Sequence, residues 1–294
     1  MRWNKITLVG VGLLGGSLGL AVKRRRLARQ VAGYVRRAAS VKDCEKAGAV
    51  DFATTDLLAA VWDADLVVLC TPLAQMCPLV QQMLPALKRG AIVTDVGSVK
   101  GSVVKELETL VAKAGAHFVG SHPMAGAEKT GVAAARADLF ECAACVVTPT
   151  KRTNPSAARK VQHLWQSVGA RVLTLPPATH DRLVSRSSHL PHVVAAALAT
   201  FVLDPKSPAP QAALCANGFR DTTRIASGSP EMWRDIALAN RKEVRRALDG
   251  FVRELQRVQA VLRRGGVGEV SKVFETAKAR RDHWRTQCVS PALE

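Results

Sequence analysis

A glycine-rich turn near the start of the chain constrains the fold more than any other feature. Residues 10–15 read Gly-Val-Gly-Leu-Leu-Gly, directly after an apolar run at 6–9 and before a helical pattern. Between a strand and a helix, glycines at this spacing allow a tight turn, close approach to a pyrophosphate and close packing of helix on strand. The phosphates then lie at the positive end of the helix. The turn predicts a dinucleotide site that includes Gly10, Gly12, Leu13, Leu14 and Gly15.

Short apolar strands alternate with helical patterns through the first part of the chain. Beyond residues 6–9, strands are predicted at 30–35, 65–70, 91–95, 145–148 and 171–175. Helices are predicted at 13–29, 40–47, 102–114 and 156–168. This alternation indicates an α/β fold, with a mainly parallel sheet covered by helices. We expect a Rossmann-type domain over residues 1–176.

The pattern changes after Pro176 and Pro177. A helix is predicted from Thr179 to about Leu203, interrupted only by Pro191, and further helices at 230–264 and 267–284. No strand pattern is present in this part. We expect an all-α domain over residues 177–294. Such domains often supply dimer contacts in two-domain dehydrogenases, and this analogy predicts a homodimer.

The charge balance and the N-terminus narrow the class of protein. The chain has 294 residues, with 42 Lys and Arg against 24 Asp and Glu, and the excess is spread out. Such a field attracts anions such as nucleotides or polycarboxylates; we expect no nucleic-acid and no membrane partner. The apolar run 6–22 is broken by five glycines and ends in Lys-Arg-Arg-Arg without a cleavage site, unlike a signal peptide. With seven scattered cysteines, the sequence predicts a cytoplasmic enzyme.

The end of the second predicted strand discriminates between NAD and NADP. NAD-binding proteins place an acid about 20 residues beyond the glycine turn, where it accepts a hydrogen bond from the ribose 2′-hydroxyl. Here Val35 stands at that place, followed by Arg36 and Arg37. Guanidinium groups form charge-assisted bonds to a 2′-phosphate. We predict NADP as the cofactor, with NAD as the alternative. Thr71 and Pro72, which end another strand, are also assigned to the cofactor.

Three further segments carry side chains suited to acid–base chemistry. Ser98 lies in Asp-Val-Gly-Ser-Val-Lys (95–100), at the carboxyl end of a strand, where ligands bind in open α/β sheets. His122 lies in a second post-strand loop, 120–128, and a neutral imidazole is suited to taking a proton at neutral pH. The third segment comprises Ser-His-Leu-Pro-His at 188–192 and Gly-Phe-Arg-Asp-Thr-Thr-Arg at 218–224.

Together these segments resemble the prephenate and arogenate dehydrogenases of tyrosine biosynthesis. The match comprises GxGLxGGSLGLA, VGSVK, GSHPMAGAEKTG, SHLPH and GFRDTTRIASGSPEMWRDI, in order from Gly10 to Ile236. The resemblance implies an oxidoreductase that removes hydride from C4 of a cyclohexadienol while the ring carboxylate leaves as CO₂. Prephenate then gives 4-hydroxyphenylpyruvate, and arogenate gives tyrosine.

The resemblance also implies roles for individual residues. His122 matches the catalytic base, and Ser98 matches the serine that hydrogen-bonds the reacting hydroxyl and the histidine beside the cofactor. Arg224 matches an arginine that binds a substrate carboxylate, and His192 a histidine of substrate recognition. Glu128 matches an acidic gate residue, and Trp233 belongs to a segment thought to reach a neighbouring subunit's site. No metal is required. Four histidines match no motif and are expected at the surface: His117, His163, His180 and His283.

Two alternatives stay open at this stage. The presence of His192 favours prephenate, but arogenate, or both compounds, is the alternative substrate. His189 and His192 could instead be packed helix residues. A different β-hydroxyacid-type reductase would need a catalytic Lys on the helix predicted at 179–203, and that stretch holds none.

Overall fold

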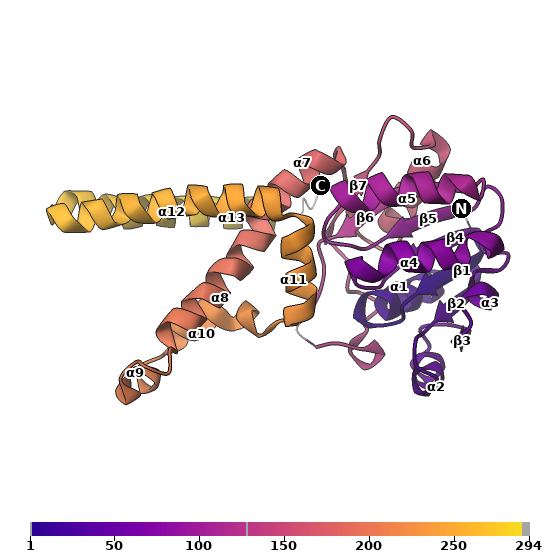
Figure 1. Ribbon diagram of the computed structural model, residues 1–294, viewed down its shortest axis with the longest axis horizontal. Helices are drawn as coiled ribbons and strands as arrows, with labels where there is room; N and C mark the ends of the chain where they lie inside the picture. Colours follow the sequence, from indigo (N-terminus) through magenta and orange to yellow (C-terminus); the bar gives the residue numbers. More distant parts are fainter. Residues whose placement is uncertain (1, 128, 290–294) are drawn as a thin grey trace. The chain divides into compact units, whose positions relative to one another are not determined.

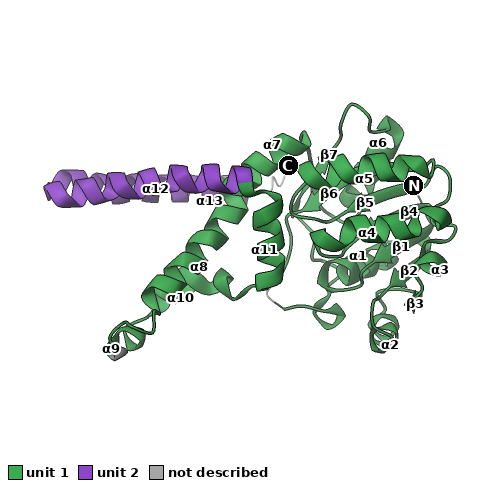
Figure 2. Ribbon diagram, viewed as in Figure 1, with its two compact units in different colours: residues 1–241 green, residues 242–294 purple. Residues whose placement is uncertain are grey.

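The computed structural model describes residues 2–127 and 129–289, which form two compact units. Residues 1–241 make up the first unit and residues 242–294 the second (Figure 2). The first unit holds the sheet, its covering helices and a set of helices that follows them.

An eight-stranded sheet forms the centre of the first unit (Figure 1). Its order is β3-β2-β1-β4-β5-β6-β7-β8, and every neighbouring pair is parallel except β6 and β7. The first six positions have the order of a dinucleotide-binding sheet, with the reversal between β1 and β4. The strands are β1 (Trp3–Val9), β2 (Ala28–Tyr34), β3 (Phe52–Thr54), β4 (Leu66–Leu69), β5 (Ile92–Asp95), β6 (His117–Pro123), β7 (Ala144–Thr148) and β8 (Arg171–Thr174).

Helices cover both faces of the sheet, because successive strand side chains point to opposite sides. In β4, Leu66 and Val68 join one buried apolar cluster, and Val67 and Leu69 join the other. Against the first cluster pack α1 (Leu13–Arg24), α2 (Ala39–Lys46) and α6 (Pro155–Ser167). Against the second pack α3 (Leu57–Val61), α4 (Leu73–Met83) and α5 (Gly101–Lys113). The predicted α/β class is confirmed.

Within the described residues, only helices follow the sheet. In the first unit they are α7 (Pro177–Val184), a π-helical turn η3 (Ser185–His189), α8 (Leu190–Val202), α9 (Ala209–Ala213), α10 (Asn217–Thr223), a 3-10 turn η4 (Arg224–Ser227) and α11 (Pro230–Ala239). The second unit consists of α12 (Arg241–Arg264), whose first residue belongs to the first unit, and α13 (Val267–Val289). The helical character predicted for this part is confirmed.

Several predicted boundaries were wrong for local reasons. The helix predicted at 13–29 ends at Arg24, because Arg26 takes a left-handed φ of 54° and β2 begins two residues later. The helix predicted at 230–264 is divided at Asn240, whose buried side chain donates to the backbone of Asp181. The loop predicted at 120–128 begins later, because β6 runs to Pro123 and includes His122. Strands β3 and β6 were not predicted as such.

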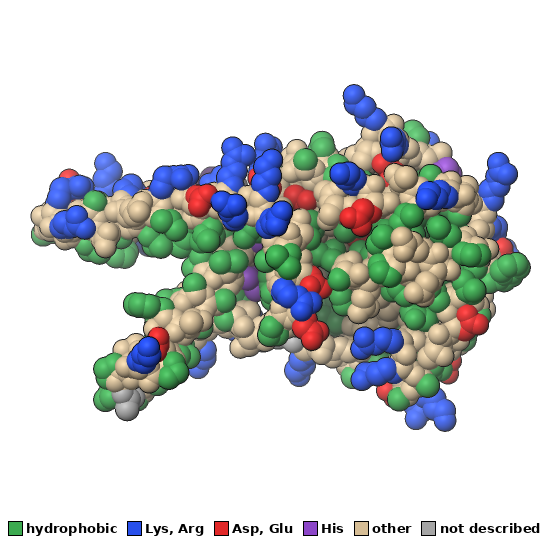
Figure 3. Space-filling model, viewed as in Figure 1, with side chains coloured by type: hydrophobic (Ala, Val, Ile, Leu, Met, Phe, Trp, Pro, Cys, Tyr) green, Lys and Arg blue, Asp and Glu red, His purple; other side chains and the backbone are tan. Residues whose placement is uncertain are grey.

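The basic residues are dispersed. On the visible face of the first unit, Lys and Arg side chains lie among acidic and apolar ones rather than in one patch, whereas along the second unit they line one edge of the helices and apolar side chains line the other (Figure 3). Among the helices of residues 2–127 and 129–289, none is long and apolar enough to cross a membrane.

Candidate active site

The glycine turn between β1 and α1 has the geometry of a nucleotide cradle. Gly10 takes a left-handed φ of 97°, and a Cβ there would come within 2.9 Å of the carbonyl oxygen of Cys70. A Cβ on Gly15 would collide with the carbonyl oxygen of Gly10, so the turn closes only without side chains. Gly12, in contrast, faces open space, and the N-terminus of α1 receives no side-chain cap. Leu13 and Leu14 form the first turn of that helix. Free backbone donors and a bare approach path fit a pyrophosphate.

A cavity of about 400 Å³ continues from this turn. Gly10, Arg36, Thr71 and Pro72 all line it, and the Oγ1 of Thr71 is buried without a partner there. The two neighbours of Arg36 in the chain, Val35 and Arg37, do not line this cavity. Val35 is only 6% exposed and packs into the apolar core, whereas Arg37 is exposed and is not among the lining residues.

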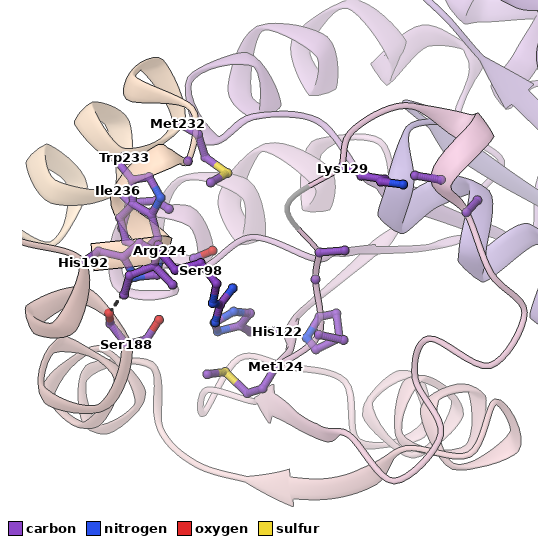
Figure 4. Close-up of a pocket in the computed structure, with 18 of the residues that line it drawn as sticks. Ser98, His122, Met124, Lys129, Ser188, His192, Arg224, Met232, Trp233 and Ile236 are labelled. Carbon is purple, nitrogen blue, oxygen red and sulfur yellow. Dashed lines mark hydrogen bonds between the residues drawn. The ribbon is translucent and has the colours of Figure 1, made fainter. Parts of the chain in front are cut away.

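A second cavity, of about 1000 Å³, brings together five of the residues predicted for chemistry or substrate binding (Figure 4). Its lining includes Ser98, His122, His192, Arg224 and Trp233. Ser98 comes from the β5–α5 loop and His122 from β6, so the neighbouring carboxyl ends of two strands supply them. The remaining three come from the start of α8, from η4 and from α11. Glu128 lies outside the described residues.

Two of these residues form a stacked wall of the cavity. The rings of His192 and Trp233 lie 3.5 Å apart between centroids, at 25° to each other. The Nδ1–H of His192 donates to the carbonyl oxygen of Ser188 at 3.1 Å, which orients the ring (Figure 4). Burial lowers the pKa of His192. The structure thus places Trp233 in the cavity of its own chain.

The loop that follows β6 lines this cavity and also contacts α1, the helix that follows the glycine turn. Ala133, Ala134, Ala135 and Arg136 line the cavity, and the backbone N–H of Arg136 donates to the Oγ of Ser17 on α1 at 2.9 Å. A Cβ on Gly16 would come within 2.9 Å of the Cβ of Ala135, so a glycine lets this loop lie close to α1. One wall of the cavity is therefore the loop that packs against α1, the helix whose N-terminus is the phosphate cradle.

Behind His122 lies a histidine that was expected at the surface. His180 is fully buried, and its Nε2 lies 2.8 Å from the Nδ1 of His122. Its own Nδ1 lies 2.8 Å from a carboxylate oxygen of Asp181. The surface prediction was wrong because α7 packs against α5, which turns His180 inward. The sequence offered one signal, the His180-Asp181 pair, but not the fold that brings it to His122.

A buried ion pair joins the loop of Ser98 to the strand of His122. Lys100, fully buried, contacts the carboxylate of Asp95 through its Nζ and donates to the carbonyl oxygen of Ser121 at 2.9 Å. Asp95 in turn accepts from the backbone N–H groups of Gly97 and Ser121. Burial lowers the pKa of Lys100, and the attraction of Asp95 opposes that shift. Through Lys100, the pair holds the carboxyl end of β5 next to that of β6. This ion pair was not predicted.

The electrostatic surroundings keep His122 uncharged. Burial is the main cause that lowers its pKa well below the usual value, and repulsion from His180, Lys100 and His189 adds to it. Burial also lowers the pKa of His189 to about 4. A neutral imidazole at a cavity wall can accept a proton from a bound hydroxyl. Among residues 2–127 and 129–289, no group of three or more His, Cys, Asp or Glu is placed to hold a metal ion.

A nucleotide cradle next to a cavity with a neutral imidazole is the arrangement of a nicotinamide-dependent dehydrogenase. Family models agree: that of the prephenate dehydrogenase nucleotide-binding domain matches residues 18–174, and that of the prephenate dehydrogenase dimerization domain matches residues 176–276. The chain belongs to the prephenate dehydrogenase family.

Individual relatives cover nearly the whole chain. Prephenate dehydrogenase of Bacillus subtilis is 34% identical over 95% of this chain and 76% of its own length. Cyclohexadienyl dehydrogenase of Zymomonas mobilis is 35% identical over 95% of both chains. Among solved structures, prephenate dehydrogenase from Aquifex aeolicus with hydroxyphenyl propionate and NAD⁺ has a TM-score of 0.90 and 32% identity, covering 96% of this chain and 99% of that one. Synechocystis arogenate dehydrogenase has a TM-score of 0.81 and 30% identity, covering 95% and 99%.

Proposed function

We propose that this enzyme is an NADP-preferring prephenate dehydrogenase, which converts prephenate to 4-hydroxyphenylpyruvate and CO₂. The observation that carries the proposal is the convergence of Ser98, His122 and Arg224 on one cavity, a wall of which is the loop that packs against α1. Relatives that resemble this chain over nearly all of its length are named prephenate dehydrogenase, cyclohexadienyl dehydrogenase and arogenate dehydrogenase. Oxidation of arogenate, or of both compounds, is therefore the second candidate.

In this proposal each of three cavity residues has a separate role. His122 takes the proton of the C4 hydroxyl, and Ser98 holds that hydroxyl in line with the ring nitrogen. An oxidised nicotinamide, when bound, supplies the acceptor for the hydride that C4 loses. The electron pair of the bond to the departing carboxylate enters the ring, and the proton returns from His122 to the ring oxygen. Arg224 binds a substrate carboxylate, where a planar guanidinium matches a planar anion.

The cofactor preference rests on Arg36. Its side chain lines the cavity that begins at Gly10, and Val35 supplies no carboxylate to repel a 2′-phosphate. Arg36→Ala should raise the KM for NADP⁺ about tenfold or more and leave that for NAD⁺ nearly unchanged, because one charge-assisted contact is lost. Arg29→Ala, at an exposed arginine of β2, the strand that precedes Arg36, is the matched control. Equal changes for the two cofactors would contradict the 2′-phosphate contact.

The deciding experiment is a grid of initial rates with two substrates and two cofactors. Prephenate with NADP⁺ should give the highest kcat/KM. A higher value with arogenate would favour the second candidate, and a higher value with NAD⁺ would reject the cofactor preference. No reduced nicotinamide in any of the four combinations would reject the proposed function itself. Arg224→Ala should chiefly raise the KM for the substrate, and an unchanged KM would exclude carboxylate binding by Arg224.

We further propose a homodimer, a cytoplasmic location and a domain boundary at residue 176. The match of residues 176–276 to a dimerization domain supports the first, and exposed apolar side chains such as Phe201 and Leu214 lie on those helices or beside them. The six described cysteines are free thiols, as a reducing compartment favours. Sedimentation velocity would test the dimer, which predicts one species of twice the chain mass.

A further inference from the structure

His180 lies directly behind His122 and has no part in the chemistry derived above. Both of its ring nitrogens are engaged, Nε2 with the Nδ1 of His122 and Nδ1 with Asp181, each at 2.8 Å. The two imidazole rings meet edge to face, with centroids 5.1 Å apart and planes at 70°. His180 is fully buried, so the protein supplies the partners of its ring nitrogens.

His122, His180 and Asp181 form a hydrogen-bonded row, and the carboxylate of Asp181 determines the proton positions along it. Asp181 accepts the backbone N–H groups of Lys100 and Gly101, each at 2.8 Å, at the start of α5. A helix N-terminus favours negative charge, and an ionised carboxylate only accepts hydrogen bonds. The proton between Asp181 and His180 therefore belongs to the Nδ1 of His180. In the neutral ring, the Nε2 of His180 is then an acceptor.

An acceptor at that place fixes the tautomer of His122. Its Nδ1 must carry the proton that it donates to His180, which leaves the lone pair on Nε2, the other ring nitrogen of a side chain that lines the cavity. We propose that His180 and Asp181 are positioning residues that hold His122 as the tautomer with a basic Nε2 and share the positive charge that this base gains. The catalytic part of the proposal rests on the function proposed above.

The proton movements balance without any further reactant. The proton of the substrate hydroxyl goes to the Nε2 of His122, and the Nδ1 proton is shared with the Nε2 of His180. The Nδ1 proton of His180 stays in its bond to Asp181. When the base returns its proton to the ring oxygen, the row is restored. Asp181 thus offsets the charge of an imidazolium that burial would otherwise disfavour.

Other charged or titratable groups surround this row. Asp95 is paired with Lys100 beneath β6, His189 approaches from η3 and Cys145 lies on the neighbouring strand β7. Across the cavity stand Lys129, Arg136, His192 and Arg224. Since Asp95 is paired with Lys100, Asp181, which is hydrogen-bonded to His180, is the carboxylate that completes the row.

Nitrogen NMR of protein labelled with ¹⁵N-histidine tests the tautomer without any substrate. The resonances of His122, assigned with His122→Asn, should show a protonated Nδ1 and an unprotonated Nε2 at neutral pH. In His180→Phe, which keeps a buried ring but no acceptor, this tautomer should lose its preference. In His180→Gln, an amide oxygen can still accept from Nδ1, and the tautomer should persist. A protonated Nε2 in the wild-type protein would overturn the proposal, whatever the enzyme's substrate.

Kinetics in the same variants test the sharing of charge. His180→Phe should lower kcat about 100-fold with the KM for substrate within about twofold, and His180→Gln about tenfold. His163→Phe, at an exposed histidine of α6, is the matched control and should retain full turnover. A kcat for His180→Phe within threefold of wild type would overturn the proposal, as would equal losses in the two His180 variants.

If His180→Phe fails to fold, the wild-type spectrum and His180→Gln still decide. Wild-type inactivity in the rate grid would reject the proposed function and leave the NMR result intact.

Discussion

The glycine turn and the cluster around His122 are built in opposite ways. The turn is made by backbone from six consecutive residues, and it works because side chains are missing at Gly10, Gly12 and Gly15. The cluster is made by buried polar side chains from several elements, and one of its bonds joins residues 81 positions apart. The first offers free donors to a ligand, whereas in the second the side chains of His122, His180 and Asp181 hydrogen-bond one another. Substitutions in the turn should therefore change affinity where a Cβ has room and stability where it would collide, and substitutions in the cluster should change chemistry, titration and stability.

The largest difference between the two regions should come from the base itself. His122→Asn should lower kcat by about 10³ or more, because an amide cannot accept the hydroxyl proton. The KM for substrate and the affinity for cofactor should change little. Stopped-flow kinetics and cofactor-induced quenching of tryptophan fluorescence would measure the two quantities. Turnover near that of the wild type would remove His122 from the base role.

Among these substitutions, loss of the Lys100–Asp95 ion pair should have the largest effect on the free energy of unfolding. Lys100→Met leaves the buried carboxylate of Asp95 without its cation and should lower the free energy of unfolding by about 3–5 kcal/mol. Urea denaturation would measure the loss. Lys105→Met, at an exposed position of the same helix, should change the free energy of unfolding by less than about 0.5 kcal/mol. Equal effects of the two substitutions would show that the pair contributes no net stability.

Acid should weaken the cluster through His189. The pKa of this residue is about 4 in the folded protein against 6.5 for the free side chain, so the unfolded chain binds the proton first as the pH falls. Stability present above pH 6.5 is then lost down to pH 4, by about 3 kcal/mol. His189→Leu should show a smaller loss between pH 7 and pH 4 than the wild type, whereas His163→Leu should follow the wild type. Identical pH curves for all three proteins would contradict the shift.

The smallest expected effect separates the glycines of the turn. Because Gly12 faces open space at a φ of −92°, Gly12→Ala should leave the Tm unchanged and weaken cofactor binding about 10- to 100-fold by obstructing the pyrophosphate. Gly15→Ala should lower the Tm instead, since its Cβ would collide with the Gly10 carbonyl. Calorimetry and cofactor titration would distinguish the two. Unchanged affinity in Gly12→Ala would place the phosphates elsewhere.

The sequence predicted the parts of the site that local pattern encodes. The turn at residues 10–15, the alternation of strands and helices, and the position of Ser98 after a strand all follow from short-range periodicity and glycine spacing. His122 was assigned to a loop, whereas it lies within β6, a strand that was not predicted. The sequence predicted Arg36 and Arg37 alike for the cofactor and did not distinguish Arg36, which lines the cavity, from Arg37, which does not, because side-chain direction at a strand end depends on the packing of neighbouring elements. Nor did it predict the boundary at Asn240, whose buried side chain hydrogen-bonds the backbone of Asp181, 59 positions away in the chain.

By itself, then, the amino-acid order determined the nucleotide cradle, the α/β architecture and the resemblance to a family, since each depends on residues close together in the chain. Only the tertiary structure decided which histidine supports His122 and which lysine holds Asp95. His180 and Lys100 carry no distinguishing local pattern, and they acquire their partners when α7 and α5 pack and exclude water from their polar groups. Burial requires those groups to find hydrogen-bond partners, and that requirement is met only in the folded protein.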